Sequence, residues 1–108
     1  MKVNPETMSW TAPTTNVDGT EITYALEYEV GLDQKGIFSP IVTIPGQLQP
    51  DNRYTAPIAD LPLEYGEHTI ALRSFAKEAP DRVSEWSEPV TFVLSAEIPR
   101  APLDLRVT

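Results

Sequence analysis

Few side chains of this chain are of the types that carry out acid–base or nucleophilic chemistry, and the sequence does not group them. His68 is the single histidine, and there is no cysteine. A catalytic histidine needs a nucleophile and an orienting carboxylate beside it. No nucleophile motif such as G-x-S-x-G occurs in the chain. We therefore expect no catalytic residue and no enzyme activity.

The candidates for metal binding are equally sparse. Asn16 and Asp18-Gly19 supply oxygen atoms in one loop, but Ca²⁺ takes six or more oxygens and the loop lacks calcium-loop spacing. His68 has no Cys, Asp or Glu at zinc-ligand spacing. We predict a plain turn at Asn16–Gly19, a packing role for His68, and neither a metal nor a cofactor.

Ser84-Glu-Trp-Ser87 places a tryptophan between two serines. Arg73 or Arg82 could stack on Trp86 as a cation–π pair, worth about 0.5–1 kcal/mol at an exposed site. The favoured interpretation is that this segment stiffens the edge of a strand. Arg73 and Trp86 are the candidate interaction residues here.

Aromatic rings are the remaining side chains that could bind a ligand, because exposed rings on one face can stack on sugars. Alternation assigns three rings to the core, namely Tyr24, Tyr28 and Phe92. Four others are left as thin evidence for a sugar site: Tyr54, Tyr65, Phe75 and Trp86. Carbohydrate therefore stays a weakly supported alternative ligand.

Composition limits the partners. The 108 residues suit one domain, and the net charge of −8 opposes binding to nucleic acid or to a membrane surface. No apolar run approaches the roughly 18 residues of a membrane span, and the N-terminus shows no signal-peptide pattern. We expect neither nucleic acid nor a membrane as a partner.

The elements that must position these side chains are strands, because the hydrophobic period is two. Turn residues separate six predicted strands, with loops at Asn16–Gly19 and Gly31–Gly36. The strands are expected at Thr7–Thr11, Ile22–Val30, Pro40–Ile44, Tyr54–Ile58, His68–Ala76 and Val90–Leu94. Short strands at this spacing favour an all-β antiparallel sandwich over a βαβ fold.

Three motifs in order resemble the fibronectin type III family. They are Trp10-Thr-Ala-Pro13, Leu61 followed by His68-Thr-Ile-Ala-Leu-Arg-Ser74, and Val83-Ser-Glu-Trp-Ser-Glu-Pro-Val90. The resemblance covers about residues 5 to 94 and is closest to the bacterial and bacteriophage versions. It implies an immunoglobulin-like antiparallel β-sandwich with a structural or adhesive role.

Two features depart from that family: the residue at position 68 and the first strand. His68 stands where the family has its corner tyrosine, whose hydroxyl bonds nearby backbone; either His68 or Tyr65 could make that bond. Ser84–Ser87 also resembles part of the WSxWS box of cytokine receptors. The cysteines of such receptors are absent, so a receptor function is not expected.

The family's first strand is missing before Thr7, and a similar segment occurs at the C-terminus. After a Pro-containing linker at 95–102, Leu103, Leu105 and Val107 share one face of a predicted strand. A missing first strand leaves an unpaired edge and an uncovered strip of core. The C-terminal strand could complete its own domain, begin the next domain of a tandem chain from which this chain is excerpted, or enter a neighbouring subunit.

We thus predict a fibronectin type III-like sandwich at 5–95, followed at 96–108 by a linker and a displaced or exchanged strand. The expected function is a non-catalytic spacer or docking module that binds protein partners, or itself, through the open edge. Resemblance favours a phage tail, a virion or a bacterial surface as its location. The alternative is an accessory carbohydrate-binding module attached to an enzyme.

Overall fold

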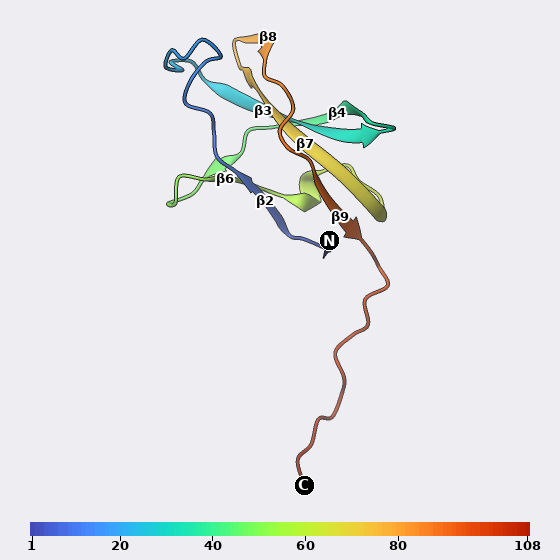
Figure 1. Ribbon diagram of the computed structural model, residues 1–108. Coiled ribbons are helices and arrows are strands. Elements are labelled where there is room, and N and C mark those ends of the chain that lie inside the picture. Colours follow the sequence, from blue (N-terminus) through green and yellow to red (C-terminus); the bar gives the residue numbers. More distant parts are fainter.

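Two β-sheets face each other in the computed structural model, which describes residues 1–108 (Figure 1). The larger sheet has the order β1-β9-β7-β3-β4, with β8 joined to β7, and the smaller has the order β2-β6-β5. Their bounds are β1 Lys2–Val3, β2 Thr7–Trp10, β3 Leu26–Gln34, β4 Ile37–Ile44, β5 Gln47–Leu48, β6 Tyr54–Pro57, β7 Gly66–Ala76, β8 Ala79–Val83 and β9 Val90–Leu94. The predicted all-β sandwich is confirmed.

The hairpin of β3 and β4 corrects two predicted boundaries. β3 begins at Leu26, not at Ile22, and it runs through Gly31 to Gln34. The predicted loop at Gly31–Gly36 is therefore wrong except for its last two residues. Lys35 and Gly36 have φ angles of 59° and 87°, the positive values of a two-residue hairpin turn.

Other strands also differ from the sequence pattern. β4 begins at Ile37 instead of Pro40, and Ile58 opens a 3₁₀ turn, Ile58–Asp60, instead of ending a strand. The strands β1, β5 and β8 were not predicted. β1 and β5 have two residues each, too few for an alternating pattern, and β8 carries Pro80 and Asp81, which are unfavourable in strands. This turn is the only helical element, and no helix is long and apolar enough to span a membrane.

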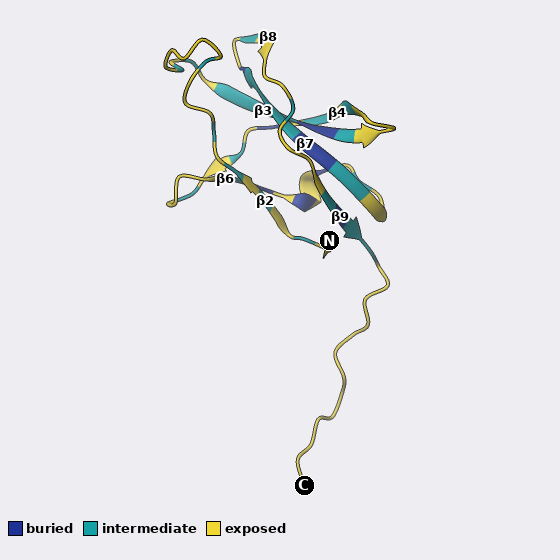
Figure 2. Cartoon of the chain, viewed as in Figure 1, coloured by how far each residue is buried: buried dark blue, intermediate teal, exposed yellow.

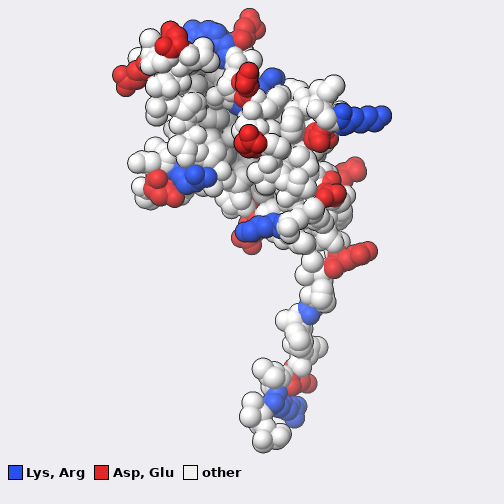
Figure 3. All heavy atoms as spheres, in the orientation of Figure 1, with Lys and Arg blue, Asp and Glu red and all other residues white.

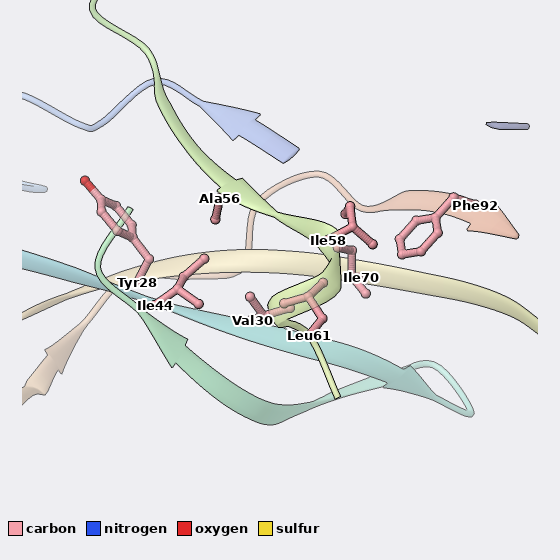
Figure 4. Packing of buried hydrophobic residues seen from close by; sticks show 8 residues of the cluster. All are labelled: Tyr28, Val30, Ile44, Ala56, Ile58, Leu61, Ile70 and Phe92. Atoms are coloured by element: carbon pink, nitrogen blue, oxygen red, sulfur yellow. The ribbon is translucent and has the colours of Figure 1, made fainter. Parts of the chain in front are cut away.

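The core lies between the two sheets, where eight buried side chains meet (Figure 4). They are Tyr28, Val30, Ile44, Ala56, Ile58, Leu61, Ile70 and Phe92. The core assignment of Tyr24 is wrong. Its ring is half-buried beneath the Arg82 guanidinium, 4.4 Å away, and its hydroxyl donates to the Asn16 side chain.

Trp10 is half-buried at the border of this core. Its ring is stacked with Tyr54 at 6.2 Å and meets Tyr28 edge-on at 5.0 Å. An added Cβ on Gly46 would lie 2.7 Å from the Trp10 ring. The indole is thus held on three sides, and its remaining side faces the gap between the sheets.

The residues after β9 leave the sandwich as an extended, exposed segment (Figure 2). Leu103, Leu105 and Val107 are 90%, 92% and 96% exposed. They form no strand within the chain. Completion of the domain by its own C-terminal segment is therefore not the arrangement observed.

Candidate functional site

A groove of about 690 Å³ opens between β2 and the opposing edge made by β9 and residues 84–88. We call it the edge groove. Core side chains form its floor, including Tyr28, Val30 and Phe92. The sequence predicted an uncovered strip of core beside β2. The edge groove lies at that place, but its floor residues are buried, and its most exposed apolar side chain is that of Val90, at 61%.

Strand edges without partners border the edge groove on both sides. β2 pairs with β6 on one side and has no strand on the other. β9 pairs with β7 over Val90–Leu94, but β1 covers its free edge at two positions only, Lys2 beside Phe92 and Val3 beside Val93. Unpaired edges of this kind accept a further strand.

The segment 84–88 is fastened to β7 by two serines. The amide nitrogens of Ser84 and Ser87 donate to the carbonyls of Ser74 and Leu72, each at 2.8 Å. In return, the Ser84 and Ser87 hydroxyls accept from the amides of Ser74 and Leu72, each at 3.0 Å. This pairing stiffens the groove wall, as the sequence predicted for the strand edge.

Trp86 lies over the outer face of the larger sheet. The Arg73 guanidinium is 4.2 Å from its ring centre and pairs with Glu29 at 2.5 Å. Phe38 flanks the indole at 5.8 Å, and Gly31 leaves room beneath it, since an added Cβ would come within 2.6 Å. Of the two predicted stacking partners, Arg73 takes this position, while Arg82 covers Tyr24.

His68, one of the two residues that the sequence offered for a bond to nearby backbone, makes such a bond. Its Nε2–H donates to the Glu64 carbonyl at 2.6 Å, and its ring packs 6.1 Å from that of Phe92. Tyr65 is 75% exposed and does not replace it. The ring also borders a small polar hollow of about 290 Å³ with Asp33 and Glu67.

Residues 16–20 form the plain turn that was predicted. Asp18 Oδ1 accepts from the Thr20 amide at 3.0 Å and from its hydroxyl at 2.6 Å. These bonds hold the pKa of the Asp18 carboxyl below its usual value, with the Thr20 hydroxyl as the largest cause. No three His, Asp or Glu side chains of the chain lie close enough to hold a metal ion.

Trp10 and Tyr28 bring two polar atoms to the groove floor. Burial raises the pKa of the Tyr28 hydroxyl, and the neighbouring Trp10 indole opposes the shift without cancelling it. The Trp10 Nε1 atom is buried and reaches no oxygen at hydrogen-bond geometry, so burial dominates. Neither group has an acid–base partner beside it. What the groove provides for a ligand is therefore its shape and its apolar surface.

The structure separates the five predicted interaction residues. Arg73 borders the edge groove and contacts Trp86, whereas the three aliphatic residues at 103, 105 and 107 are on the projecting segment. Sequence reasoning missed Val90, a groove residue that is 61% exposed. The alternation of apolar residues in Val90–Leu94 indicated that Val90 belongs to a strand. It could not indicate that Val90 is exposed, because this depends on the lack of a strand beside it on the free edge of β9.

Comparison with family models, with curated proteins and with solved structures finds no match to this chain.

Proposed function

We propose that this chain is a non-catalytic protein-interaction module of the fibronectin type III kind. It serves as a spacer or docking domain in a phage tail, a virion or a bacterial surface assembly. The observation that supports this proposal is the edge groove, where the apolar floor and two free strand edges lie together.

The sheet composition supports the resemblance to immunoglobulin-like sandwiches. Such folds place strands B, E and D in one sheet and C, F and G in the other. Here β2, β6 and β5 make one sheet, and β3, β7 and β9 adjoin in the other, which is the same partition once β2 is taken as strand B. The phage or surface setting rests on the resemblance of the Trp10–Pro13 and Val83–Val90 motifs.

The chemistry of the edge groove suits an extended peptide. A strand added at an open edge gains main-chain hydrogen bonds, and its alternate side chains enter the apolar floor. The groove floor is built from Tyr28, Val30 and Phe92 with no charged residue among them. A polypeptide supplies both kinds of contact.

The aromatic arrangement gives carbohydrate binding less support. Phe38 and Trp86 are tilted by 40° to each other, and Arg73 covers one face of the indole. The Trp10, Tyr28 and Tyr54 rings pack on one another. Acidic and basic side chains are interspersed over the face of the molecule seen in Figure 3, and no basic patch stands out on that face.

The test is titration of the isotope-labelled full chain with synthetic decapeptides of alternating apolar and polar residues, followed by nuclear magnetic resonance. We expect amide shifts at Thr7–Ala12 and at Ser84–Glu88 and Val90. A parallel titration with oligosaccharides serves as the comparison. Shifts at Phe38 and Trp86 with sugar, and none at the edge groove with any peptide, would replace this proposal by the carbohydrate alternative.

A further inference from the structure

We propose that the edge groove receives residues 99–108 of a second copy of this chain, in a head-to-tail junction. We call residues 99–108 the tail strand. This inference rests on the proposed docking function and names its partner. The chain carries one edge groove and one tail strand, so each copy can give one strand and accept another.

The tail strand has the side-chain pattern that the groove floor requires. Leu103, Leu105 and Val107 alternate with polar residues and are almost wholly exposed. Three aliphatic side chains on one face of an extended segment lose unfavourable contact with water when they are buried. The edge groove presents Val90, which is 61% exposed, and the half-buried side chains of Met8 and Leu72 to a docking strand.

The orientation of the added strand follows from β1. β1 runs parallel to β9 and pairs with it at Phe92 and Val93, so the edge of β9 is free only before Phe92. An added strand that precedes β1 along this edge and runs in the same direction as β1 is parallel to β9 and antiparallel to β2. In that position its last apolar residue, Val107, lies near Val90, and Leu103 lies near the level of Arg73 on β7.

A chain cannot place its own tail strand in this position. The tail leaves β9 at Ser95, at the lower end of the sandwich in Figure 1. It would have to climb about 25 Å, some seven or eight strand residues, and reverse direction twice. The eight residues of the linker 95–102 reach about 26–29 Å when straight, and two turns of four residues each consume that length.

Entry as a simple hairpin from below is also blocked. That path runs along the edge of β9 at Phe92 and Val93, where Lys2 and Val3 are already paired. In a junction between two copies neither reversal is needed, since the linker of the second copy only spans the distance between the two domains. The geometry thus favours exchange between copies over self-completion.

The groove lining carries charges of both signs. Glu85 and Glu88 stand there together with Lys2 and Arg73, whereas the tail strand has Arg100 and Arg106 against Asp104. Opposite charges at the rim of an interface guide its orientation more than they raise its affinity.

One residue of the tail strand must change conformation on binding. Asp104 has a φ of 55°, which is outside the extended range of a strand. Aspartate adopts both conformations at lower cost than most residues. Docking therefore straightens the tail strand at Asp104, and the free segment is not pre-formed.

The test uses five full-length variants and sedimentation mass over a concentration series. Leu105→Asp places a charge on the apolar face of the tail strand, and Val90→Asp places one in the edge groove. Val17→Asp and Ile37→Asp add the same charge at exposed sites outside both the edge groove and the tail strand. Thr7→Lys is a second groove variant in case Val90→Asp lowers the unfolding midpoint.

We expect the wild type to rise above its monomer mass of 12.0 kDa and both control variants to follow it. Leu105→Asp and Val90→Asp alone should each remain monomeric. An equimolar mixture of these two should form a dimer and nothing larger, because only one junction can form between an intact groove and an intact tail strand. Heterologous junctions repeated in the wild type give a filament or a ring.

A wild type that stays monomeric throughout the series overturns the inference, as does a Leu105→Asp variant that associates like the wild type. The same holds for a mixture that does not dimerise. The proposed docking function is tested separately, by the peptide titration. If unrelated alternating decapeptides shift the groove amides while the wild type is monomeric, the docking function stands and the partner is another protein.

Discussion

The guanidinium of Arg73 lies 4.2 Å from the ring centre of Trp86. The same side chain pairs with Glu29 at 2.5 Å, so Arg73 is fixed by an ion pair on β3 while it covers the indole. Because Trp86 belongs to the segment that walls the edge groove, this contact joins the groove wall to the middle of the larger sheet.

Arg73→Ala should lower the free energy of unfolding by about 1 kcal/mol. A cation–π contact near the surface contributes about 0.5–1 kcal/mol, and a partly exposed ion pair adds little. The change should also shift the emission of Trp86, measured in a Trp10→Phe background so that Trp86 is the sole emitter. Arg82→Ala, which removes the contact with Tyr24, is the matched control. Equal spectra for both variants would argue against the stack.

Gly31→Ala should destabilise the fold by about 1–3 kcal/mol, as overpacking does. The new Cβ would lie 2.6 Å from the Trp86 ring, so the indole must move away from β3. In a Trp86→Ala background the same change should cost nothing, since alanine is otherwise preferred to glycine in a strand. Chemical denaturation of the four proteins of this cycle measures the coupling. Identical costs in the two backgrounds would show that the clash does not involve Trp86.

Trp10→Ala should cost about 3 kcal/mol, the lower end for a large aromatic residue, because the ring is half-buried. The variant loses contacts with both Tyr28 and Tyr54. Trp10→Phe keeps an aromatic ring and should cost less. Thermal and urea unfolding compare the two variants, and an unchanged midpoint for Trp10→Ala would remove the ring from the packing of the sandwich.

Tyr28 gives the fold an alkaline limit. Burial raises the pKa of its hydroxyl above the ordinary value of 10.0, so the folded state holds this proton more tightly than the unfolded state. The associated stability is fully present below pH about 10 and is lost as the pH rises through the folded-state pKa. Urea midpoints measured from neutral pH upward should fall less in Tyr28→Phe than in the wild type. Parallel curves would assign the alkaline loss to other groups.

The alternation of apolar and polar residues predicted the sandwich and most of its long strands. Tyr28 and Val30, for example, are separated by one residue on the same face of the predicted strand, and both are buried. The alternation failed at Gly31, which was interpreted as the start of a loop. That glycine is required within β3 by the ring of Trp86, a residue 55 positions away. The pairing of β1 with β9 also escaped the sequence, since Lys2 and Val3 have no local feature that indicates a partner near the other end of the chain. The sequence also predicted that β2 has a free edge and that Ser84–Ser87 stiffens the edge of a strand. It did not show that this segment bonds to β7 at Leu72 and Ser74, because those bonds depend on the tertiary fold.

Asn4 has a mechanical consequence for a head-to-tail assembly. Its side chain donates to the Ser95 carbonyl at 2.9 Å and accepts from the Ser95 amide at 2.8 Å, at the point where the tail leaves the domain. A tensile load on the tail therefore enters the sandwich along β9, whose bonds to β7 lie across the strand direction. Those bonds are loaded in shear and share the force, instead of opening one after another. In the proposed head-to-tail assembly, the exit point of the tail would therefore transmit tension along β9.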